Sequence, residues 1–263
     1  MKYLKNILFW LFILAYFILI SGAIAEKRRH LYCKDLVISV MDSLESGFNN
    51  QQDIKELILK NENLIGKPVN EINLKSIETR LLKQRSVKSA ETFITENGNL
   101  HINISHRYPV VRIENKKYTG YCLDSEGNIF PLSSRFNPRI IFANGYITEP
   151  FDLNKTKNIH DAETGKLAGS KAVIYDLLKL INYINGDEFW KAQIVQVYVN
   201  NKYEFELIPR VGAHVILLGT IENYEEKFGN LKTLYLEGFN KIGWNDYIQI
   251  NLKFKDQIIC TKR

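Results

Sequence analysis

Residues 87–105, with the sequence VKSAETFITENGNLHINIS, decide how the N-terminal half of the chain folds. Val87–Thr95 contains β-branched and aromatic side chains and predicts a strand. Asn97-Gly98 is a dipeptide that strongly favours a tight hairpin turn. In residues 100–105, leucine or isoleucine alternates with a polar or small residue, so a second strand would have one apolar face. The stretch therefore predicts an antiparallel hairpin with a face that must be buried.

A strand and two helices are expected upstream of this hairpin. Asp35–Val40 (DLVISV) is rich in β-branched residues and predicts a strand. Residues 48–58 place isoleucine and leucine at helical spacing, and Asn73 can cap a second helix that begins after it. The order strand, helix, helix, strand, strand over residues 35–107 predicts two helices packed on one face of a three-stranded sheet.

The C-terminal part, residues 108–263, is dominated by short strands. They are expected at residues 110–113, 118–123, 129–132, 139–142, 194–199, 203–208, 214–218, 233–237 and 247–254, with helices at 170–184 and 222–231. This order predicts a mostly antiparallel sheet with helices packed on it. The chain as a whole is expected to have an α+β fold.

Composition excludes several classes of protein. Hydrophobic residues make up 45% and charged residues 24% of the chain, which are values of a globular protein. Residues 1–34 contain six lysines and arginines against the single Glu26, so they carry five of the six net positive charges. The near-neutral remainder lacks the clustered cations that nucleic-acid binding requires, so we expect no nucleic-acid partner.

No motif for catalysis or for cofactor binding occurs in the sequence. The five histidines are scattered, and Cys33, Cys122 and Cys260 lack the spacing of a metal site. We therefore expect no enzyme activity, no cofactor and no metal. The odd number of cysteines allows at most one disulfide within a single chain, and the sequence leaves open whether it forms.

The N-terminal segment Asn6–Ala25 contains no charged residue in twenty positions. At about 1.5 Å per residue, such a helix covers a hydrocarbon core of about 30 Å, which predicts a transmembrane helix behind a tail of residues 1–5. The alternative is a cleaved signal peptide, with Lys2 and Lys5 as its basic region and Ala23-Ile24-Ala25 as its cleavage site. The basic residues 27–29 favour a cytoplasmic C-terminal side, in conflict with the signal-like features.

The C-terminus is expected to end in two strands. The apolar residues of the first strand, Tyr247–Phe254, would share one face: Ile248, Ile250, Leu252 and Phe254. Lys255-Asp256 can turn the chain, and residues 257–261 can form a last short strand. A last strand is often a sheet edge with unpaired backbone groups, which can recruit a strand from a partner.

The cations around this last strand allow two interpretations. They could block unwanted strand pairing, or they could meet an acidic partner. Both interpretations apply to Lys253, Lys255, Lys262 and Arg263.

Several blocks of sequence, taken in order, resemble the FtsQ/DivIB family of bacterial division proteins, particularly its Bacteroidetes type. Residues 53–58 (DIKELI) lead to Gly66, and SVKSAE at 86–91 is similar to the family's WVKSAEV. HRYPVVRI at 106–113 is similar to ERxPVARI, and YCLDSEGNIFPL at 121–132 to YYLDxxGxVxPL. The last blocks that resemble the family are GWNDY at 243–247 and LKF at 252–254. Ser86 departs from the family, which often has tryptophan there.

The resemblance implies a specific architecture and location. It implies a short cytoplasmic tail, one transmembrane helix, a POTRA domain at residues 35–107 and a β-domain at residues 108–263. Both domains would lie in the periplasm, against the charge count, and the protein would be enriched at the division site of the inner membrane.

The resemblance also implies a function and a binding site. Members are non-enzymatic scaffolds that bind FtsB-like and FtsL-like division proteins and so help to regulate septal peptidoglycan synthesis. FtsB adds a strand to the C-terminal edge of the β-domain, while the POTRA domain is a second docking surface for other division proteins. The positions that match the edge site are Lys253, Phe254, Lys255, Gln257, Ile258, Ile259, Cys260 and Thr261. Phe254 stands where the family often has tyrosine.

Two other functions remain open from the sequence. The chain could be a POTRA-type periplasmic module for assembly or chaperoning, although it shows one POTRA-like unit and no membrane barrel. It could also be a secreted enzyme or binding protein released by cleavage after Ala25.

Overall fold

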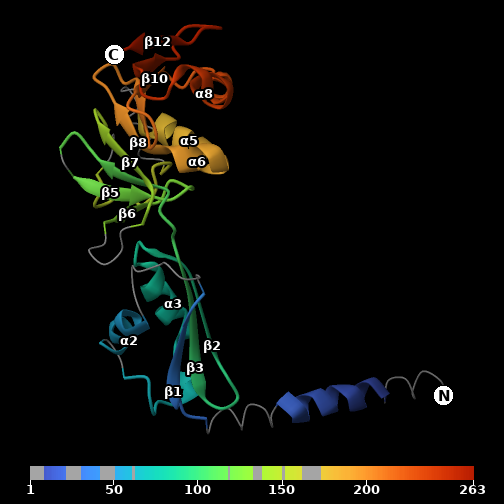
Figure 1. Cartoon of the computed structure of the whole chain (residues 1–263). Coiled ribbons are helices and arrows are strands. Elements are labelled where there is room, and N and C mark those ends of the chain that lie inside the picture. Colours follow the sequence, from blue (N-terminus) through green and yellow to red (C-terminus); the bar gives the residue numbers. More distant parts are fainter. Residues whose placement is uncertain are drawn as a thin grey trace. The chain divides into compact units, whose positions relative to one another are not determined.

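A computed structural model describes residues 9–21, 31–41, 51–60, 63–117, 119–132, 138–149, 152–161 and 173–263 (Figure 1). The chain divides into two compact units, Met1–His106 and Arg107–Arg263. Each unit is built around its own cluster of buried apolar residues.

The N-terminal segment is described in part. Residues 9–21 form a helix whose side chains are almost all exposed. Residues 1–8 and 22–30 lie outside the described residues, so both ends of the expected span Asn6–Ala25 and the expected tail do as well. In the part of the chain that the structure describes, no helix is both long and apolar enough to cross a bilayer.

The sheet of the first unit confirms the expected hairpin. Its strands β1 (Asp35–Val40), β2 (Val87–Ile94) and β3 (Asn99–His106) are arranged in the order β1-β3-β2, with β1 parallel and β2 antiparallel to β3. Gly98 has a φ of +87° in the turn, a value that glycine adopts at little cost. The alternating apolar residues of β3 are fully buried: Leu100, Ile102 and Ile104.

Two helices cover one face of this sheet. They are α2 (Gln51–Leu59) and α3 (Leu74–Leu82), with a single 3₁₀ turn, η1 (Val69–Glu71), between them. The side chain of Asn73 accepts a hydrogen bond from the backbone N–H of Ser76 at 3.0 Å, which confirms the expected cap. Ile54 and Ile58 of α2, with Ile77 and Leu81 of α3, are buried against the sheet.

The second unit contains a sheet of nine strands among its described residues, in the order β12-β11-β10-β9-β8-β7-β4-β5-β6. The strands are β4 (Val111–Glu114), β5 (Gly120–Leu123), β6 (Ile129–Pro131), β7 (Ile141–Gly145), β8 (Ile194–Val199), β9 (Phe205–Pro209), β10 (Val215–Gly219), β11 (Tyr247–Asn251) and β12 (Ile259–Lys262). The neighbouring pairs β4–β7, β7–β8 and β10–β11 are parallel. The other pairs are antiparallel, so the sheet is mostly antiparallel with a parallel centre.

Helices pack on one face of this sheet, as α5, α6 and α8 show in Figure 1. The described helices are α5 (Val173–Gly186), α6 (Glu188–Gln193), α7 (Tyr224–Thr233), the π-helical turn η2 (Leu234–Gly238) and α8 (Phe239–Ile242). The α5 helix contributes seven buried residues to the core, consistent with the helix expected at 170–184; residues 170–172 lie outside the described part.

The strand expected at residues 233–237 is wrong, because this segment continues α7 as a helix. Phe228, Leu231, Tyr235 and Phe239 follow each other at intervals of three or four residues, and all are buried. This helical stripe overrides the local preference of Thr233 and Tyr235 for extended backbone. Tyr235 also lies within hydrogen-bond distance of the buried His214, at 2.7 Å from Nε2 to the hydroxyl.

The buried His214 makes stability depend on pH. Burial lowers the pKa of its imidazole below the usual value, so the ring stays neutral in the folded chain where the unfolded chain takes up a proton. We therefore expect the free energy of unfolding to fall as the pH drops below about 6.5, until the folded ring also titrates. Unfolding curves at several pH values, compared with those of His214→Gln, measure this slope. A variant with the same slope as the wild type would contradict the assignment.

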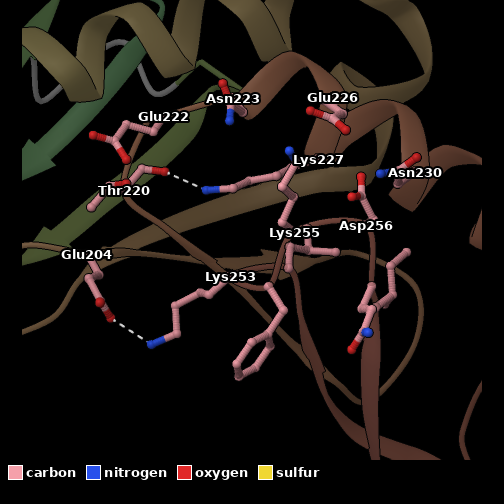
Figure 2. A pocket seen from close by; sticks show the side chains of 14 residues that line it. Glu204, Thr220, Glu222, Asn223, Glu226, Lys227, Asn230, Lys253, Lys255 and Asp256 are labelled. Atoms are coloured by element: carbon pink, nitrogen blue, oxygen red, sulfur yellow. Dashed lines mark hydrogen bonds and ion pairs between the residues drawn. The ribbon is translucent and has the colours of Figure 1, made fainter.

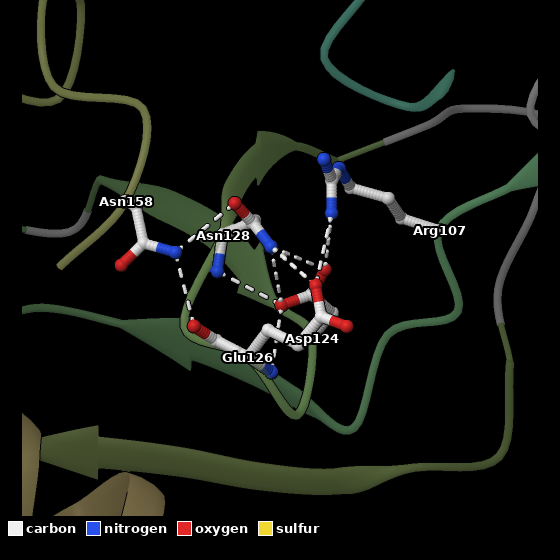
Figure 3. A network of polar contacts seen from close by, with 5 residues as sticks. All are labelled: Arg107, Asp124, Glu126, Asn128 and Asn158. Atoms are coloured by element: carbon white, nitrogen blue, oxygen red, sulfur yellow. Dashed lines mark hydrogen bonds and ion pairs between the residues drawn. The ribbon is translucent and has the colours of Figure 1, made fainter. Parts of the chain in front are cut away.

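A polar network closes the turn between β5 and β6 (Figure 3). The Asp124 carboxylate accepts hydrogen bonds from the backbone N–H groups of Glu126 at 3.0 Å and Asn128 at 2.8 Å, and from the Asn128 amide. It also pairs with the Arg107 guanidinium at 3.0 Å. Asn128 in turn accepts from the amide of Asn158 at 3.0 Å. Arg107, the first residue of the second unit, is thereby fixed to the sheet.

Candidate functional site: the C-terminal edge of the sheet

The last strand, β12, lies at one edge of the nine-stranded sheet and pairs only with β11 among the described residues. The last strand was expected at residues 257–261. In the structure it begins two residues later, at Ile259, and ends at Lys262. Of the expected site, Ile259, Cys260 and Thr261 therefore lie on the edge strand. The remaining five residues, Lys253, Phe254, Lys255, Gln257 and Ile258, lie in the loop between β11 and β12.

The register of β12 shows which backbone groups point out of the sheet. The backbone N–H of Arg263 donates to the carbonyl of Asp246 at 3.0 Å, so Arg263 faces β11. Because alternate residues of an antiparallel strand face the same neighbour, Thr261 and Ile259 face β11 as well. The N–H and C=O groups of Cys260 and Lys262 therefore point away from the sheet and can pair with another strand.

A β-bulge changes which side chains of β11 are buried. The register shifts between Tyr247 and Gln249, so Ile248 is the extra residue opposite Thr261. Ile250 and Leu252 are buried, but 43% of Ile248 and 53% of Phe254 are exposed. The expected common apolar face of residues 248–254 is thus wrong at both ends: the bulge turns Ile248 outward, and Phe254 lies beyond the end of the strand.

The loop before β12 is held in place by hydrogen bonds to β10 and to the side chain of Asn251, the last residue of β11. The N–H of Leu252 donates to the carbonyl of Leu217 at 3.0 Å, and the side chain of Asn251 accepts from the N–H of Lys253 at 3.0 Å. Asp256 has a φ of 57°, in the left-handed region that aspartate tolerates in turns. Lys255-Asp256 is therefore the turn that the sequence predicted.

Lys253 has a partner within the chain. Its ammonium group donates to the Glu204 carboxylate at 3.1 Å, across 49 residues of sequence (Figure 2). The hydrogen bond from Lys253 holds the pKa of Glu204 below its usual value. No sequence signal links these two residues, because the contact depends on the pairing of β9, β10 and β11. Lys253 thus fixes the loop, while the exposed Lys255 is available to a partner.

A cavity of about 300 Å³ lies between the start of α7 and this loop (Figure 2). Its lining mixes four carboxylates with three ammonium groups, from Glu204, Glu222, Glu226 and Asp256 and from Lys227, Lys253 and Lys255. The ammonium group of Lys227 donates to the carbonyls of Leu218 and Thr220, both at 3.0 Å. This balance of charges favours neither an anionic nor a cationic ligand.

The side chains at this edge divide into anchors and exposed groups. Ile258 and Cys260 pack against the core. Phe254 and Ile259 are exposed apolar side chains, at 53% and 44%, and Ile248 adds a third that the sequence pattern did not predict. Gln257, Thr261 and Lys262 are exposed polar residues. The edge therefore combines outward backbone groups with apolar and cationic side chains, which is the combination that strand addition uses.

No group of histidine, cysteine and acidic side chains within the described residues is placed to hold a metal ion. The thiols of Cys33, Cys122 and Cys260 are all free, and burial raises the pKa of each.

Two family models match the chain. The model described as FtsQ/DivIB, C-terminal related, matches residues 108–261, which is more than half of the chain. A model of a POTRA-like domain matches residues 31–105. Comparison with curated proteins gives no match. The first match runs from before β4 to Thr261 and so includes all of the nine-stranded sheet except Lys262, the last residue of β12. The second includes β1, β2, the helices and β3 up to Ser105. The chain therefore belongs to the FtsQ/DivIB family.

Proposed function

We propose that this chain is a non-enzymatic scaffold of the bacterial division machinery that holds another division protein by strand addition at β12. The partner would be an FtsB-like protein, bound together with an FtsL-like one. Through these contacts the scaffold would link early and late assembly of the division complex and regulate septal peptidoglycan synthesis.

The observation that carries this proposal is the position of β12 at the sheet edge, where all of the strand but Lys262 falls inside the region that matches the FtsQ/DivIB model. A partner strand would bond to the outward backbone groups of Cys260 and Lys262. Backbone pairing supplies affinity, and side chains that alternate along the edge supply specificity. The exposed Phe254 and Ile259 offer apolar contacts, and Lys255 offers a charge for an acidic residue of the partner.

The rest of the family architecture belongs to the same proposal. Residues 6–25 would anchor the chain in the inner membrane behind a cytoplasmic tail of residues 1–5. The domains at 35–107 and 108–263 would lie in the periplasm, with the POTRA domain as a second docking surface. The uncharged stretch of twenty residues and the family match support this arrangement. Localisation of a fluorescent fusion to mid-cell, or its absence there, tests it.

Proline at Lys262 tests strand addition directly. Proline lacks the outward N–H of Lys262 but leaves the bonds between β12 and β11 intact, because edge strands tolerate proline at such positions. Loss of this donor also leaves a partner carbonyl unsatisfied, so we expect Lys262→Pro to weaken partner binding by about tenfold or more. Co-purification of the full chain with the FtsB-like protein of its own organism, followed by titration, measures this.

The matched control is Lys262→Ala, which removes the same side chain and keeps the N–H. We expect it to change affinity by less than about twofold. A further variant, Lys255→Glu, tests the role of this lysine. It reverses an exposed charge and leaves the pair between Lys253 and Glu204 intact. Weaker binding by Lys255→Glu would indicate an acidic partner, and unchanged binding a blocking role for this lysine. Equal affinities of the proline and alanine variants would refute pairing at β12.

A further inference from the structure

A second cavity, of about 740 Å³, opens elsewhere in the C-terminal unit, where β4, β7 and β8 begin and β9 ends. None of its lining residues belongs to the edge site around β12. Its walls include apolar side chains: Val110, Ile140 and Val195 are half-buried, whereas Pro109, Ile141, Ile194 and Pro209 are buried and expose little surface to it. Parallel pairing of β4, β7 and β8 brings the starts of these three strands together, and antiparallel pairing of β8 with β9 adds the end of β9.

The rim of this cavity is aromatic and cationic. Tyr108 is 55% exposed, and Arg139, Lys191 and Arg210 are all exposed. They come from four different segments: the approach to β4, the approach to β7, the α6 helix and the residue after β9. Among the described residues, none of the three cations forms a salt bridge, and no carboxylate lines the cavity.

Three uncompensated cations around an apolar pocket attract a ligand that is both acidic and apolar. Like charges that line one cavity repel each other, and an anionic ligand relieves that repulsion. The cavity is far larger than a simple anion needs, and its volume lies in the range of about 300–1,000 Å³ that is typical of ligand clefts. Tyrosine and arginine, which form most of the rim, are also the residues most enriched at binding hot spots.

We infer that this cavity docks an acidic peptide segment that inserts an apolar or aromatic side chain between the cations. The apolar side chain would contact Val110 and Val195, and flanking carboxylates would pair with Arg139, Lys191 and Arg210. A bilayer of anionic lipid is a poorer match, because the apolar surface lies inside a concavity that a flat surface does not enter. This site goes beyond strand addition at β12 and uses none of its residues.

A displayed library of random short peptides tests this inference, because it offers the cavity acidic, basic, polar and apolar sequences alike. The full chain in detergent is used as bait, next to the variant Arg139→Glu/Arg210→Glu. The control Lys117→Glu/Lys241→Glu changes the net charge by the same amount. Its two lysines are exposed, belong to the same unit and lie outside the cavity. Selected peptides are synthesised and titrated by fluorescence anisotropy at low and high salt, and vesicles of anionic lipid are titrated in parallel.

We expect the wild type and the control to select peptides rich in aspartate and glutamate around an aromatic or aliphatic residue. The cavity variant should bind these peptides at least about tenfold more weakly, the control less than about twofold, and salt should weaken binding throughout. Peptides without acidic character, equal binding by the cavity variant, or no selected peptide would overturn the inference. Charge-dependent binding to the vesicles alone would assign the cations to a membrane surface instead. Binding of the FtsB-like protein should persist in the cavity variant, which separates this test from that of the edge strand.

Discussion

Replacement of Trp190 by alanine should lower the free energy of unfolding of the C-terminal unit by about 4 kcal/mol. Only 1% of this residue is exposed, and its ring meets the rings of Phe189, Phe228 and Tyr235 edge-on at centroid distances of 4.8, 5.0 and 5.8 Å. The substitution removes these contacts and leaves a cavity where α6, α7 and η2 meet.

The neighbouring structure has little freedom to close that cavity. The Asp187 carboxylate caps α6 by accepting from the N–H groups of Phe189 and Trp190 at 2.8 and 3.2 Å, and it pairs with Lys232 at 2.9 Å. Strand β8 begins directly after α6, so the helix is fixed at both ends. The loss should therefore include the cavity term as well as the lost transfer free energy.

Thermal and urea unfolding of the full chain, followed by circular dichroism, measure the effect. Trp190→Phe keeps a ring in the core and should cost less than half as much. Phe254→Ala removes an aromatic ring that is 53% exposed and should change stability by no more than about 0.5 kcal/mol. Equal losses in Trp190→Ala and Phe254→Ala would show that burial of Trp190 does not control stability.

Replacement of Asp124 by alanine should destabilise the C-terminal unit by about 3 kcal/mol. Only 8% of its side chain is exposed, against 20% for that of its partner Arg107. Alanine leaves the guanidinium without its nearest carboxylate and the N–H groups of Glu126 and Asn128 without their acceptor (Figure 3). Removal of one member of a partly buried ion pair is costly because the remaining charge has lost its compensation.

Two further variants separate the contribution of the ion pair with Arg107 from that of the hydrogen bonds within the turn. Asp124→Asn keeps an oxygen that can accept from the backbone, so it should lose about half as much stability as alanine. Glu126→Gln removes the carboxylate that lies 3.6 Å from Arg107 and is 58% exposed, and should cost less than about 0.5 kcal/mol. Urea unfolding of the three variants gives the comparison. A larger loss in Glu126→Gln than in Asp124→Ala would reverse the proposed ranking.

Short-range patterns in the sequence predicted the first unit well. The alternation of β3, the Asn97-Gly98 turn and the Asn73 cap each involve residues within a few positions of one another. Their hydrogen bonds and buried faces depend on local spacing, which the sequence shows directly. The same logic failed at Thr233–Glu237, where β-prone residues lie in a helix, because burial of Tyr235 beside His214 outweighs local preference.

The candidate edge site was predicted only in part. The sequence indicated that a last strand exists and that lysines and apolar residues surround it, because these features lie within residues 247–263. It did not indicate the bulge that exposes Ile248, because local patterns do not fix the register between β11 and β12. Nor did it indicate the pair between Lys253 and Glu204, because these residues lie 49 positions apart and meet only through pairing between strands that are distant in sequence. The cavity at the start of β4, β7 and β8 had no sequence signal for the same reason.

The amino-acid sequence by itself determined the division into two structural parts, the α+β composition, the local turns and caps, and the blocks that identify the family. Each of these features depends on the pattern of residues that are close to one another in the sequence. The tertiary structure alone decided that β12 is an edge, which of its backbone groups point outward, and which cations gather around an apolar cavity. Such properties depend on the order and register of nine strands, and the free energy that selects one order comes from burying all their apolar faces together.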